Sequence, residues 1–578
     1  MNNPKEKILI EDVTSLNSGY EEIVKTLSKA IKAQPKKVVG IECYPTTNEE
    51  LLLKKIIEPL QPDCIFNSND IFLPAEKVTE IIAANLTDDR VFGLMSHHKF
   101  EDFIDEEKFI QQKKLIAGKR VENKLVVIYG VGASLFESID ILVYSDLTRW
   151  EVQNRYKSKE YSNWKAENTG EDPLKMIKRG YYFEWNIADR QKKRKFSTID
   201  FLLDLHREND PKMISQPDYL KALSKVVSQP FSLVPFYEPG IWGGTWMQEK
   251  FSIGQDEKNL AWCFNGVPEE NSLLLEIENQ LFETPATNLV LLKPKELLGD
   301  KVQGRFGKKF PIRFNLLDTI DGENLSLQVH PKVDYIQDVF GATYTQDESY
   351  YILEAKNDAV VYLGVKSGVE KKDLMNALEK ASQGKETFDD EKYIYRQKMN
   401  KHDHYSIPSG TIHSSGKDSV VLEISATPNR FTFKLWDWGR VDFDGMPRPV
   451  HLEHGKENID IFKDQNWVTQ ELINPFVKLV EEAGYLEEKT GLHETEFIET
   501  RRHTLEKSKL VKNHNSVNVL CVVEGEGIII SCPTMSFKPF KVDYCQVVIV
   551  PEQITEYIIE PIKNSQTKSV KLVQAFVK

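Results

Sequence analysis

The pattern of predicted strands and helices changes near residue 230, and this change constrains the fold more than any other feature of the sequence. Before it, short apolar runs such as Lys37–Ile41 and Leu125–Gly130 alternate with helical stretches such as Thr47–Ile57. This β-α-β rhythm predicts a parallel sheet covered by helices. After it, short alternating strands broken by Gly, Pro, Asn and Asp predict barrels or sandwiches. Since 578 residues are also too many for one core, we expect a multidomain protein.

The expected domains follow this division. An α/β domain is predicted over residues 1–215, a larger β barrel over 225–460 and a second, smaller barrel over 465–578. Apolar residues at helical spacing predict a helical insertion in the larger barrel, at Lys371–Ser382. In the smaller barrel, residues 517–530 predict a hairpin with Gly525 and Gly527 in its turn, and Val547–Val550 predicts a buried strand.

Composition excludes several classes of function. The net charge of −13 disfavours non-specific nucleic-acid binding, and the short basic run Arg190–Lys195 predicts a solvated helix face. No apolar run reaches the ~18 residues that span a membrane, and residues 1–7 lack an apolar signal core. The six cysteines form no Cys-x-x-Cys pair, which favours reduced thiols. We therefore expect a cytoplasmic protein with no nucleic-acid or membrane partner; the sequence does not specify its oligomeric state.

A candidate metal site begins in the stretch from Leu325 to Pro331. In a strand, side chains two apart point to the same face, so Gln328 and His330 lie side by side. Glu348 and His413 are plausible completions further along the chain. Imidazole, carboxylate and amide ligands without a thiolate, with one position left for water or substrate, suit a catalytic zinc ion.

Several motifs occur in the order found in one enzyme family. They are Pro235–Gly244, Phe310–Asp318 followed by Leu325–Pro331, Asp347–Tyr351 and Ile407–His413. In these motifs the sequence resembles class I mannose-6-phosphate isomerases, over roughly residues 230–578. The resemblance implies cupin (jelly-roll) barrels, Zn²⁺ bound by the four candidate ligands, and a small-molecule sugar phosphate as partner. It also implies interconversion of mannose 6-phosphate and fructose 6-phosphate through an enediol.

The resemblance also assigns further site residues. Glu423 stands at the position of an active-site glutamate, and Lys434 and Arg440 stand where relatives carry basic residues. Alternative interpretations are a buried salt bridge for Glu423 and a solvated strand cation for Lys434. The chain departs from the family at Gln346, where a lysine normally precedes the metal glutamate by two residues.

The first part of the chain resembles a P-loop kinase of the uridine-kinase type, which implies a three-layer α/β fold. The stretch from Val38 to Leu52 stands at the place of the phosphate loop, but it lacks the loop's glycines and lysine. Glu42, Glu49 and Glu50 bring negative charge there instead. We therefore expect a non-catalytic domain used for binding, regulation or assembly.

Three functions are compatible with these features. The first is a zinc-dependent sugar-phosphate isomerase. The second is a metal-binding cupin that binds or senses a sugar phosphate without turnover, an alternative that Gln346 supports. The third, a bifunctional kinase-isomerase, needs an ATP affinity that the degraded loop does not readily supply.

Overall fold

The computed structural model describes residues 7–578 except 36, 427–429, 444, 446–447 and 564–567. Residues 1–6, most of the segment behind the expectation of no export, lie outside the described residues. The chain divides into two compact units. The α/β unit comprises Lys7–Lys225 with Ser272–Leu291, and the β unit comprises Val226–Asn271 with Leu292–Lys578. Among the described residues, no helix is long and apolar enough to cross a membrane.

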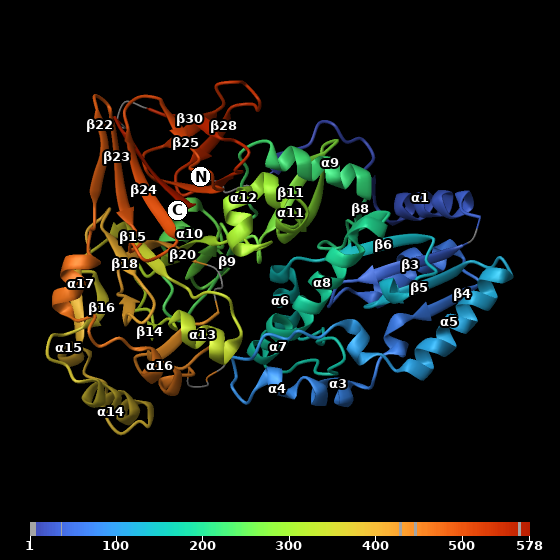
Figure 1. Cartoon of the computed structure of the whole chain (residues 1–578), viewed down its shortest axis with the longest axis horizontal. Helices are drawn as coiled ribbons and strands as arrows, with labels where there is room; N and C mark the ends of the chain where they lie inside the picture. Colours follow the sequence, from blue (N-terminus) through green and yellow to red (C-terminus); the bar gives the residue numbers. More distant parts are fainter. Residues whose placement is uncertain (1–6, 36, 427–429, 444, 446–447, 564–567) are drawn as a thin grey trace. The chain divides into compact units, whose positions relative to one another are not determined.

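The α/β unit is built on a seven-stranded sheet (Figure 1). Its order is β2 (Asn17–Ser18), β8 (Lys212–Ser215), β7 (Phe201–Asp204), β6 (Ile141–Asp146), β3 (Val38–Cys43), β5 (Val126–Gly130) and β4 (Cys64–Asn67). The pairs from β4 to β7 are parallel, as the β-α-β rhythm predicts. The central strands β3, β5 and β6 are buried along their whole length, which explains their nearly continuous apolar sequence.

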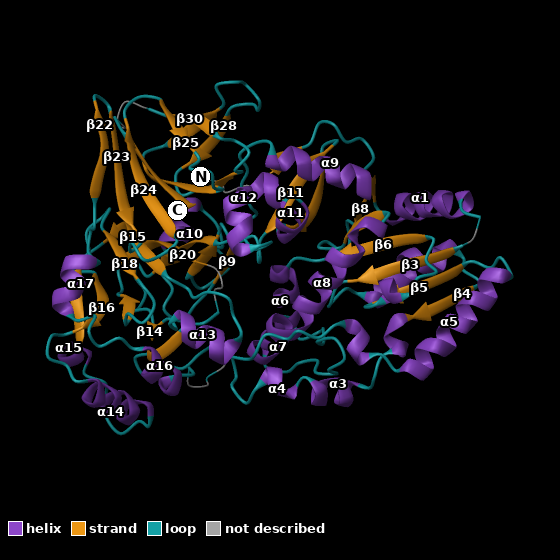
Figure 2. Ribbon diagram, in the orientation of Figure 1, coloured by secondary structure: helices purple, strands orange, loops and turns teal. Residues whose placement is uncertain are grey.

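Helices pack around this sheet (Figure 2). The longer ones are α1 (Tyr20–Ala33), α5 (Glu106–Val121), α6 (Arg149–Lys157), α7 (Pro173–Arg179), α8 (Trp185–Lys195) and α9 (Gln216–Val227). Short helices α2 (Glu49–Leu52), α3 (Ala75–Ile81) and α4 (Ala83–Leu86) complete the unit. The helix predicted at Thr47–Ile57 begins two residues later and continues as a π-helix over Leu53–Ile57. A small sheet of β1 (Lys7–Leu9), β11 (Ser272–Ile277) and β12 (Gln280–Pro285) also belongs to this unit. Of its strands, β11 and β12 come from later in the chain, as does the helix that follows them, α11 (Thr287–Leu292).

Two sheets form the larger β sandwich of the β unit. One has the order β18 (His404–Ile407), β15 (Glu348–Ala355), β20 (Ser419–Ala426), β13 (Ile312–Asp318), β10 (Trp262–Phe264) and β9 (Phe236–Glu238). The other has the order β17 (Ile394–Lys398), β16 (Val360–Val365), β19 (His413–Ser415), β14 (Leu327–Val329) and β21 (Phe433–Trp436). Leu317, Tyr350 and Val421 of the first sheet share one buried cluster with Val361 and Leu363 of the second, so the sheets pack face to face.

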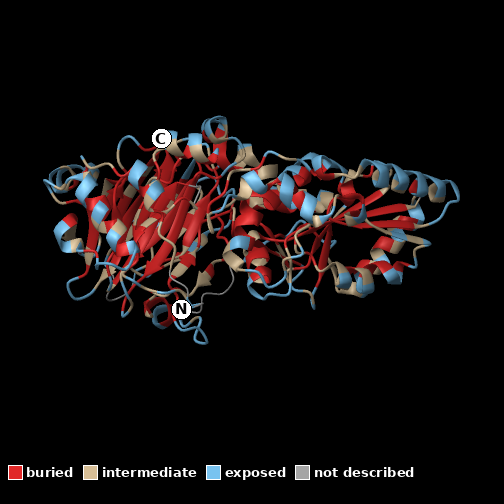
Figure 3. Cartoon of the chain, turned by 90° about the horizontal axis from the view of Figure 1, so that it is seen from below, coloured by how far each residue is buried: buried red, intermediate tan, exposed pale blue. Residues whose placement is uncertain are grey.

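Helices connect the strands of this sandwich. They are α10 (Trp246–Phe251), α12 (Pro294–Phe306), α13 (Val333–Phe340), α14 (Lys371–Ser382), α15 (Asp390–Tyr393), α16 (Leu452–Asn458) and α17 (Gln465–Glu471). The helical insertion predicted at Lys371–Ser382 has the bounds of α14, and its buried residues include Leu374 and Leu378. Figure 3 shows buried strands inside both units and exposed positions mainly on helices and loops.

The last part of the chain forms two further sheets. One contains β22 (Val477–Glu482), β23 (Tyr485–Gly491), β24 (Ile498–Leu505), β31 (Val570–Val577), β26 (Asn518–Glu524) and β29 (Val547–Val550). The other contains β25 (Lys509–Lys512), β30 (Glu556–Pro561), β27 (Gly527–Ser531) and β28 (Phe540–Asp543).

The hairpin predicted at residues 517–530 is wrong, although both of its strands exist. β26 pairs with β29 and β31, whereas β27 pairs with β28 and β30, so the two strands belong to different sheets. Gly525 and Gly527 have φ of 95° and 155°, a region that glycine enters without steric cost. They turn the chain from one sheet to the other, and a sequence pattern alone does not distinguish this turn from a hairpin.

Candidate metal centre

Three predicted ligands meet in the interior of the larger sandwich. His330, Glu348 and His413 are all at most 1% exposed, and their ligand atoms lie within 4.8 Å of one another. Glu348 Oε2 is 3.1 Å from His330 Nε2, and Glu348 Oε1 is 2.9 Å from His413 Nε2. Glu348 begins β15 in one sheet, whereas His413 begins β19 in the other and His330 follows β14. The centre therefore depends on the packing of the two sheets.

The backbone orients both imidazoles toward this centre. His330 Nδ1 lies 3.1 Å from the carbonyl oxygen of Phe431, and His413 Nδ1 lies 2.9 Å from that of Thr411. A carbonyl oxygen only accepts hydrogen bonds, so each Nδ1 carries a hydrogen, and in the neutral form of each ring Nε2 has a lone pair free for a metal. Hydrogen-bonding the second ring nitrogen to a carbonyl is a common way to orient a histidine that binds a metal.

Gln328 lies beside these groups. It is opposite His413 in the pairing of β14 with β19, and its Nε2 is 3.1 Å from His413 Nε2. The two ends of a side-chain amide exchange places by a half-turn, so Oε1 can occupy this position as a ligand. The structure thus brings all four predicted ligands together.

The electrostatics of the cluster suit a divalent cation. Burial alone raises the pKa of Glu348, but the imidazoles of His330 and His413 outweigh burial and hold it below its usual range. His330 Nε2 and Glu348 Oε1 make no hydrogen bond of normal geometry with the described residues. Buried polar atoms are seldom left this way, and a metal ion would satisfy both. The residues present therefore fit a metal.

Glu423 lies on β20, between the strand that carries Glu348 and β13. It is opposite Tyr350 on one side and Asn315 on the other, so it faces the same interior. Its Oε1 accepts hydrogen bonds from Asn315 Nδ2 at 3.1 Å and from Ser425 Oγ at 3.0 Å. Burial, followed by the negative charge of Glu348, raises the pKa of Glu423. A carboxylate with a raised pKa beside a metal cluster is typical of a general acid or base.

The two predicted basic residues have different surroundings. Lys434 is opposite Gln328 in the pairing of β14 with β21, and burial lowers its pKa to about 8. Arg440 instead forms an ion pair with Asp437 and donates from Nη1 to the carbonyl oxygen of Asn324 at 2.7 Å. The backbone of Lys434 thus lies beside that of Gln328, while the charges that act most on the pKa of its ammonium, after burial, are those of Arg448 and Asp437. The guanidinium of Arg440 is engaged by Asp437 and by the backbone of Asn324.

Gln346 contacts the centre directly. Its Nε2 donates to Glu348 Oε2 at 3.0 Å. The side chain therefore contacts the candidate metal glutamate, but as a neutral amide it does not supply the positive charge of the lysine that the resemblance implies at this position.

One strand of the site was missed by sequence reasoning. Arg313 and Asn315 lie on β13, are at most 6% exposed and share a face with each other. A signal was available, because these polar residues alternate with the apolar Ile312, Phe314 and Leu316. Polar residues at alternate positions of a strand usually indicate a face exposed to solvent. Here the five-stranded sheet covers that face, so the polar side chains are buried between the two sheets.

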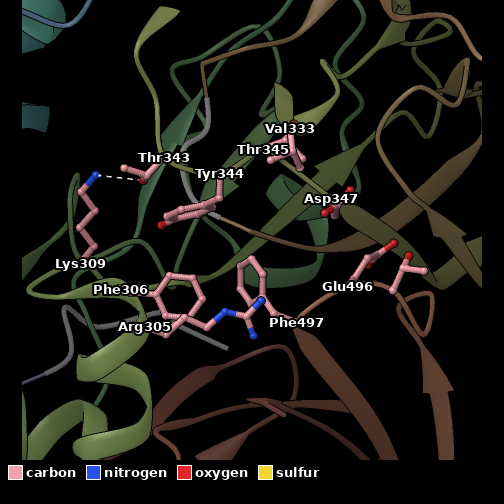
Figure 4. A pocket seen from close by; sticks show the side chains of 11 residues that line it. Arg305, Phe306, Lys309, Val333, Thr343, Tyr344, Thr345, Asp347, Glu496 and Phe497 are labelled. Atoms are coloured by element: carbon pink, nitrogen blue, oxygen red, sulfur yellow. Dashed lines mark hydrogen bonds between the residues drawn. The ribbon is translucent and has the colours of Figure 1, made fainter. Parts of the chain in front are cut away.

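A cavity is lined in part by the segment that leads into β15 (Figure 4). Its volume is about 360 Å³, and Arg305, Phe306, Tyr344, Asp347 and Glu496 are among the residues that line it. Asp347 accepts a hydrogen bond from the amide of Ser409 at 2.8 Å, while its chain neighbours on both sides belong to the metal centre. None of the predicted site residues lines this cavity.

The α/β unit has its own buried polar groups where β3, β5 and β6 end. Glu42, in the stretch predicted to replace a phosphate loop, accepts hydrogen bonds from the amides of Gly132 at 2.7 Å and Ser134 at 2.6 Å. The backbone amides near the predicted loop thus bind a carboxylate of the chain itself.

The matches to known proteins fall in two different parts of the chain. Residues 19–228 match a family described as a domain of unknown function, DUF8485. Mannose-6-phosphate isomerase ManA of Bacillus subtilis is 24% identical over 309 residues, which are 53% of this chain and 89% of the relative. The mannose-6-phosphate isomerase of Streptococcus mutans is 24% identical over 244 residues, 42% of this chain and 71% of the relative. The chain is therefore homologous to mannose-6-phosphate isomerases, at low identity and over part of its length.

Two solved structures are also similar to part of the chain. The mannose 6-phosphate isomerase from Bacillus subtilis matches 60% of this chain and 99% of its own, with 20% identity and a TM-score of 0.48. A mutant of phosphomannose isomerase from Salmonella typhimurium matches 60% of this chain and 99% of its own, with 13% identity and a TM-score of 0.44.

Proposed function

We propose that the β unit is a zinc-dependent aldose-ketose isomerase that interconverts mannose 6-phosphate and fructose 6-phosphate. The observation that carries the proposal is the buried cluster of His330, Glu348 and His413, with Glu423 facing it. Homology to mannose-6-phosphate isomerases supports the substrate class. We further propose that the sandwich is a cupin barrel and that the last part of the chain is a second one.

The proposed ligands are His330 Nε2, His413 Nε2, the Glu348 carboxylate and the Gln328 amide oxygen. A zinc ion held there supplies a Lewis acid that polarises a substrate carbonyl and stabilises the oxyanion that develops on it. Nitrogen and oxygen ligands without thiolate agree with that role.

Glu423 is the proposed base. Its carboxylate removes the proton from C2 of the open-chain aldose, and the electron pair of that bond forms the C1–C2 double bond while the carbonyl electrons move to O1. The proton then returns to C1 of the resulting enediolate, and the hydroxyl proton moves from O2 to O1, so that O2 becomes the carbonyl oxygen of the ketose. The raised pKa of Glu423 makes the carboxylate a stronger base than a solvated glutamate.

Lys434 is the proposed cation beside the reacting end of the sugar, because it shares its strand pairing with Gln328. For Arg440 the contacts favour an indirect role. It holds Asp437, which accepts a hydrogen bond from Ser326 Oγ at 3.1 Å on the approach to β14.

A second candidate function is binding of a sugar phosphate without turnover. The observation that favours it is Gln346, a neutral side chain bonded to the metal glutamate where relatives carry a lysine. A coupled assay of fructose 6-phosphate formation, run beside a metal determination, separates the two. Stoichiometric zinc with turnover supports the isomerase; stoichiometric zinc and sugar-phosphate binding without turnover supports the binding protein.

For the α/β unit we propose a P-loop kinase-like fold that does not transfer phosphate. The parallel order β4-β5-β3-β6-β7 and the occupation of backbone amides by Glu42 support this proposal. Steady-state ADP release from ATP, stimulated by an added nucleoside or sugar, would contradict it.

A further inference from the structure

The inner face of the six-stranded sheet carries two rows of polar side chains. Antiparallel pairing places Ser425 opposite Arg313 on one side and opposite Glu348 on the other. The same pairing places Glu423 between Asn315 and Tyr350. Residues opposite one another across antiparallel strands point to the same face. The metal glutamate, the proposed base and the arginine therefore share one surface.

The guanidinium of Arg313 is buried but poorly satisfied. The residue is 6% exposed, and its Nε has no hydrogen-bond partner among the described residues. No carboxylate oxygen in the described part of the chain comes within 4.0 Å of its nitrogens. An arginine has five N–H donors, so a buried one without ion pairs is costly and unusual.

The ring of Phe264 packs against this guanidinium, with 5.2 Å from the guanidinium carbon to the ring centroid. Burial lowers the pKa of Arg313, and the negative charges of Glu423, Glu270 and Glu348, the largest first, act in the opposite direction. Glu423 Oε1 already accepts hydrogen bonds from Asn315 and Ser425, so Arg313 is not needed to satisfy that oxygen.

We propose that Arg313 binds the phosphate group of the hexose 6-phosphate substrate, an inference that rests on the proposed function. Two strand spacings, roughly 9 to 10 Å, separate its backbone from that of Glu348, with Glu423 on the strand between them. In a hexose 6-phosphate the reacting carbons C1 and C2 and the phosphate on C6 are at opposite ends of the chain. The arrangement of Glu348, Glu423 and Arg313 thus fits a hexose 6-phosphate whose reacting end lies at the metal site. Its C2 proton would then lie near Glu423, and its phosphate would bind Arg313.

This assignment also explains how positive charge is kept in the site despite Gln346. A lysine at position 346 would bring a positive charge beside Glu348. Arg313, on β13 at the other side of β20, carries a positive charge on the same face of the sheet instead. A guanidinium forms two parallel hydrogen bonds to a phosphate, so Arg313 suits this group better than a lysine would.

Arg313→Met tests the inference in the full-length, zinc-loaded protein. Calorimetric titration with fructose 6-phosphate is expected to show an affinity lower by about 10- to 100-fold, with the zinc content unchanged. The Tm without ligand is expected to equal or exceed that of the wild type, because a buried and unpartnered charge is removed. A merely structural role would lower the Tm and leave the affinity unchanged, and this result would overturn the inference.

Two further variants sharpen the test. Arg313→Lys keeps the charge and the fold but not the paired hydrogen bonds, so its affinity is expected to fall less than that of Arg313→Met. Arg502→Met is the matched control, since Arg502 is a buried arginine of the β unit whose Nε and Nη2 bond to Glu488 at 3.0 and 2.8 Å. It is expected to lower the Tm and leave the affinity unchanged.

The outcomes separate the two proposals. If the wild type isomerises fructose 6-phosphate and both Arg313 variants bind it as tightly as the wild type, the inference fails and the proposed function stands. If the zinc-loaded wild type binds no fructose 6-phosphate, the proposed function and the inference fail together.

Discussion

The interior of the β sandwich and the strand ends of the α/β unit both bury charged side chains, but they satisfy them differently. In the α/β unit the ammonium of Lys192 bonds to both carboxylate oxygens of Asp146 at 3.0 Å, and Glu42 is held by two backbone amides. The prediction that the run Arg190–Lys195 is a solvated face is therefore wrong at Lys192, which is 2% exposed. In the sandwich, His330 Nε2, Glu348 Oε1 and the Nε of Arg313 have no hydrogen-bond partner among the described residues. Charges that satisfy one another indicate a structural role, whereas unsatisfied atoms that converge indicate a ligand.

The largest effect is expected from the metal cluster. His413→Ala removes one ligand and leaves the charge of Glu348 buried, so zinc content and isomerase activity should both be lost. Metal analysis after gel filtration, followed by the coupled assay, measures the two effects. His404→Gln is the control, because His404 lies on the opposite face of the same sheet and bonds to Ser349 Oγ at 2.9 Å. Full zinc occupancy with normal turnover in His413→Ala would refute the site.

The next largest effect is expected at the proposed base. Glu423→Gln keeps the shape of the side chain but cannot accept the C2 proton, so kcat should fall by about 10²- to 10⁴-fold. Zinc content and KM should change little. Exchange of the C2 proton of mannose 6-phosphate with solvent deuterium, followed by NMR, reports the same step without the coupling enzymes. Unchanged exchange would show that another group is the base.

Lys434→Met should have a smaller effect, a fall of about 10- to 100-fold in kcat/KM with zinc retained. Arg440→Met should act mainly on stability, because its guanidinium holds Asp437 and the carbonyl oxygen of Asn324. Kinetics and thermal unfolding of both variants distinguish these roles. Wild-type kcat/KM in Lys434→Met would show that Lys434 makes no contact with substrate.

The pH dependence of the wild type should reflect the same lysine. Burial lowers the pKa of Lys434 to about 8, so its side chain is cationic below that pH and loses its charge as the pH rises through it. We therefore expect kcat/KM for mannose 6-phosphate to decline above about pH 8, with no such decline from this group in Lys434→Met. A profile of kcat/KM from pH 6 to 10 for both proteins tests this, and identical profiles would contradict it.

The smallest effect on activity is expected in the α/β unit. Lys192→Met leaves Asp146 buried without its ammonium, which should cost about 3 to 5 kcal/mol of stability. Isomerase activity of the folded protein should remain that of the wild type. Chemical unfolding and the coupled assay measure the two quantities. If Lys192→Met kept its stability but lost activity, the contrast between the two regions would not hold.

Much of the fold could be predicted from the sequence because its cause is local. The switch from β-α-β rhythm to short strands, and the apolar spacing that forms α14, are set by neighbouring residues. The pairing partners of β26 and β27 were not predictable in this way, because a turn with two glycines fits both a hairpin and a crossing between sheets.

The candidate metal centre was likewise predictable from the sequence only in part. Gln328 and His330 could be paired from the sequence alone, since side chains two apart on a strand share a face. Family resemblance was needed to assign Glu423 and Lys434, and it gave no indication of Arg313, which the tertiary structure placed in the row with Glu348.

The sequence by itself thus determined the kinds of ligand, their order along the chain and the change from α/β to β architecture, all of which depend on local periodicity and side-chain chemistry. The tertiary structure decided which polar residues meet. Strand register and the packing of two sheets bring residues about a hundred positions apart, such as Arg313 and Glu423, into one interior. Burial there removes the water that would otherwise satisfy their charges, and this makes a strand of alternating residues part of a candidate site.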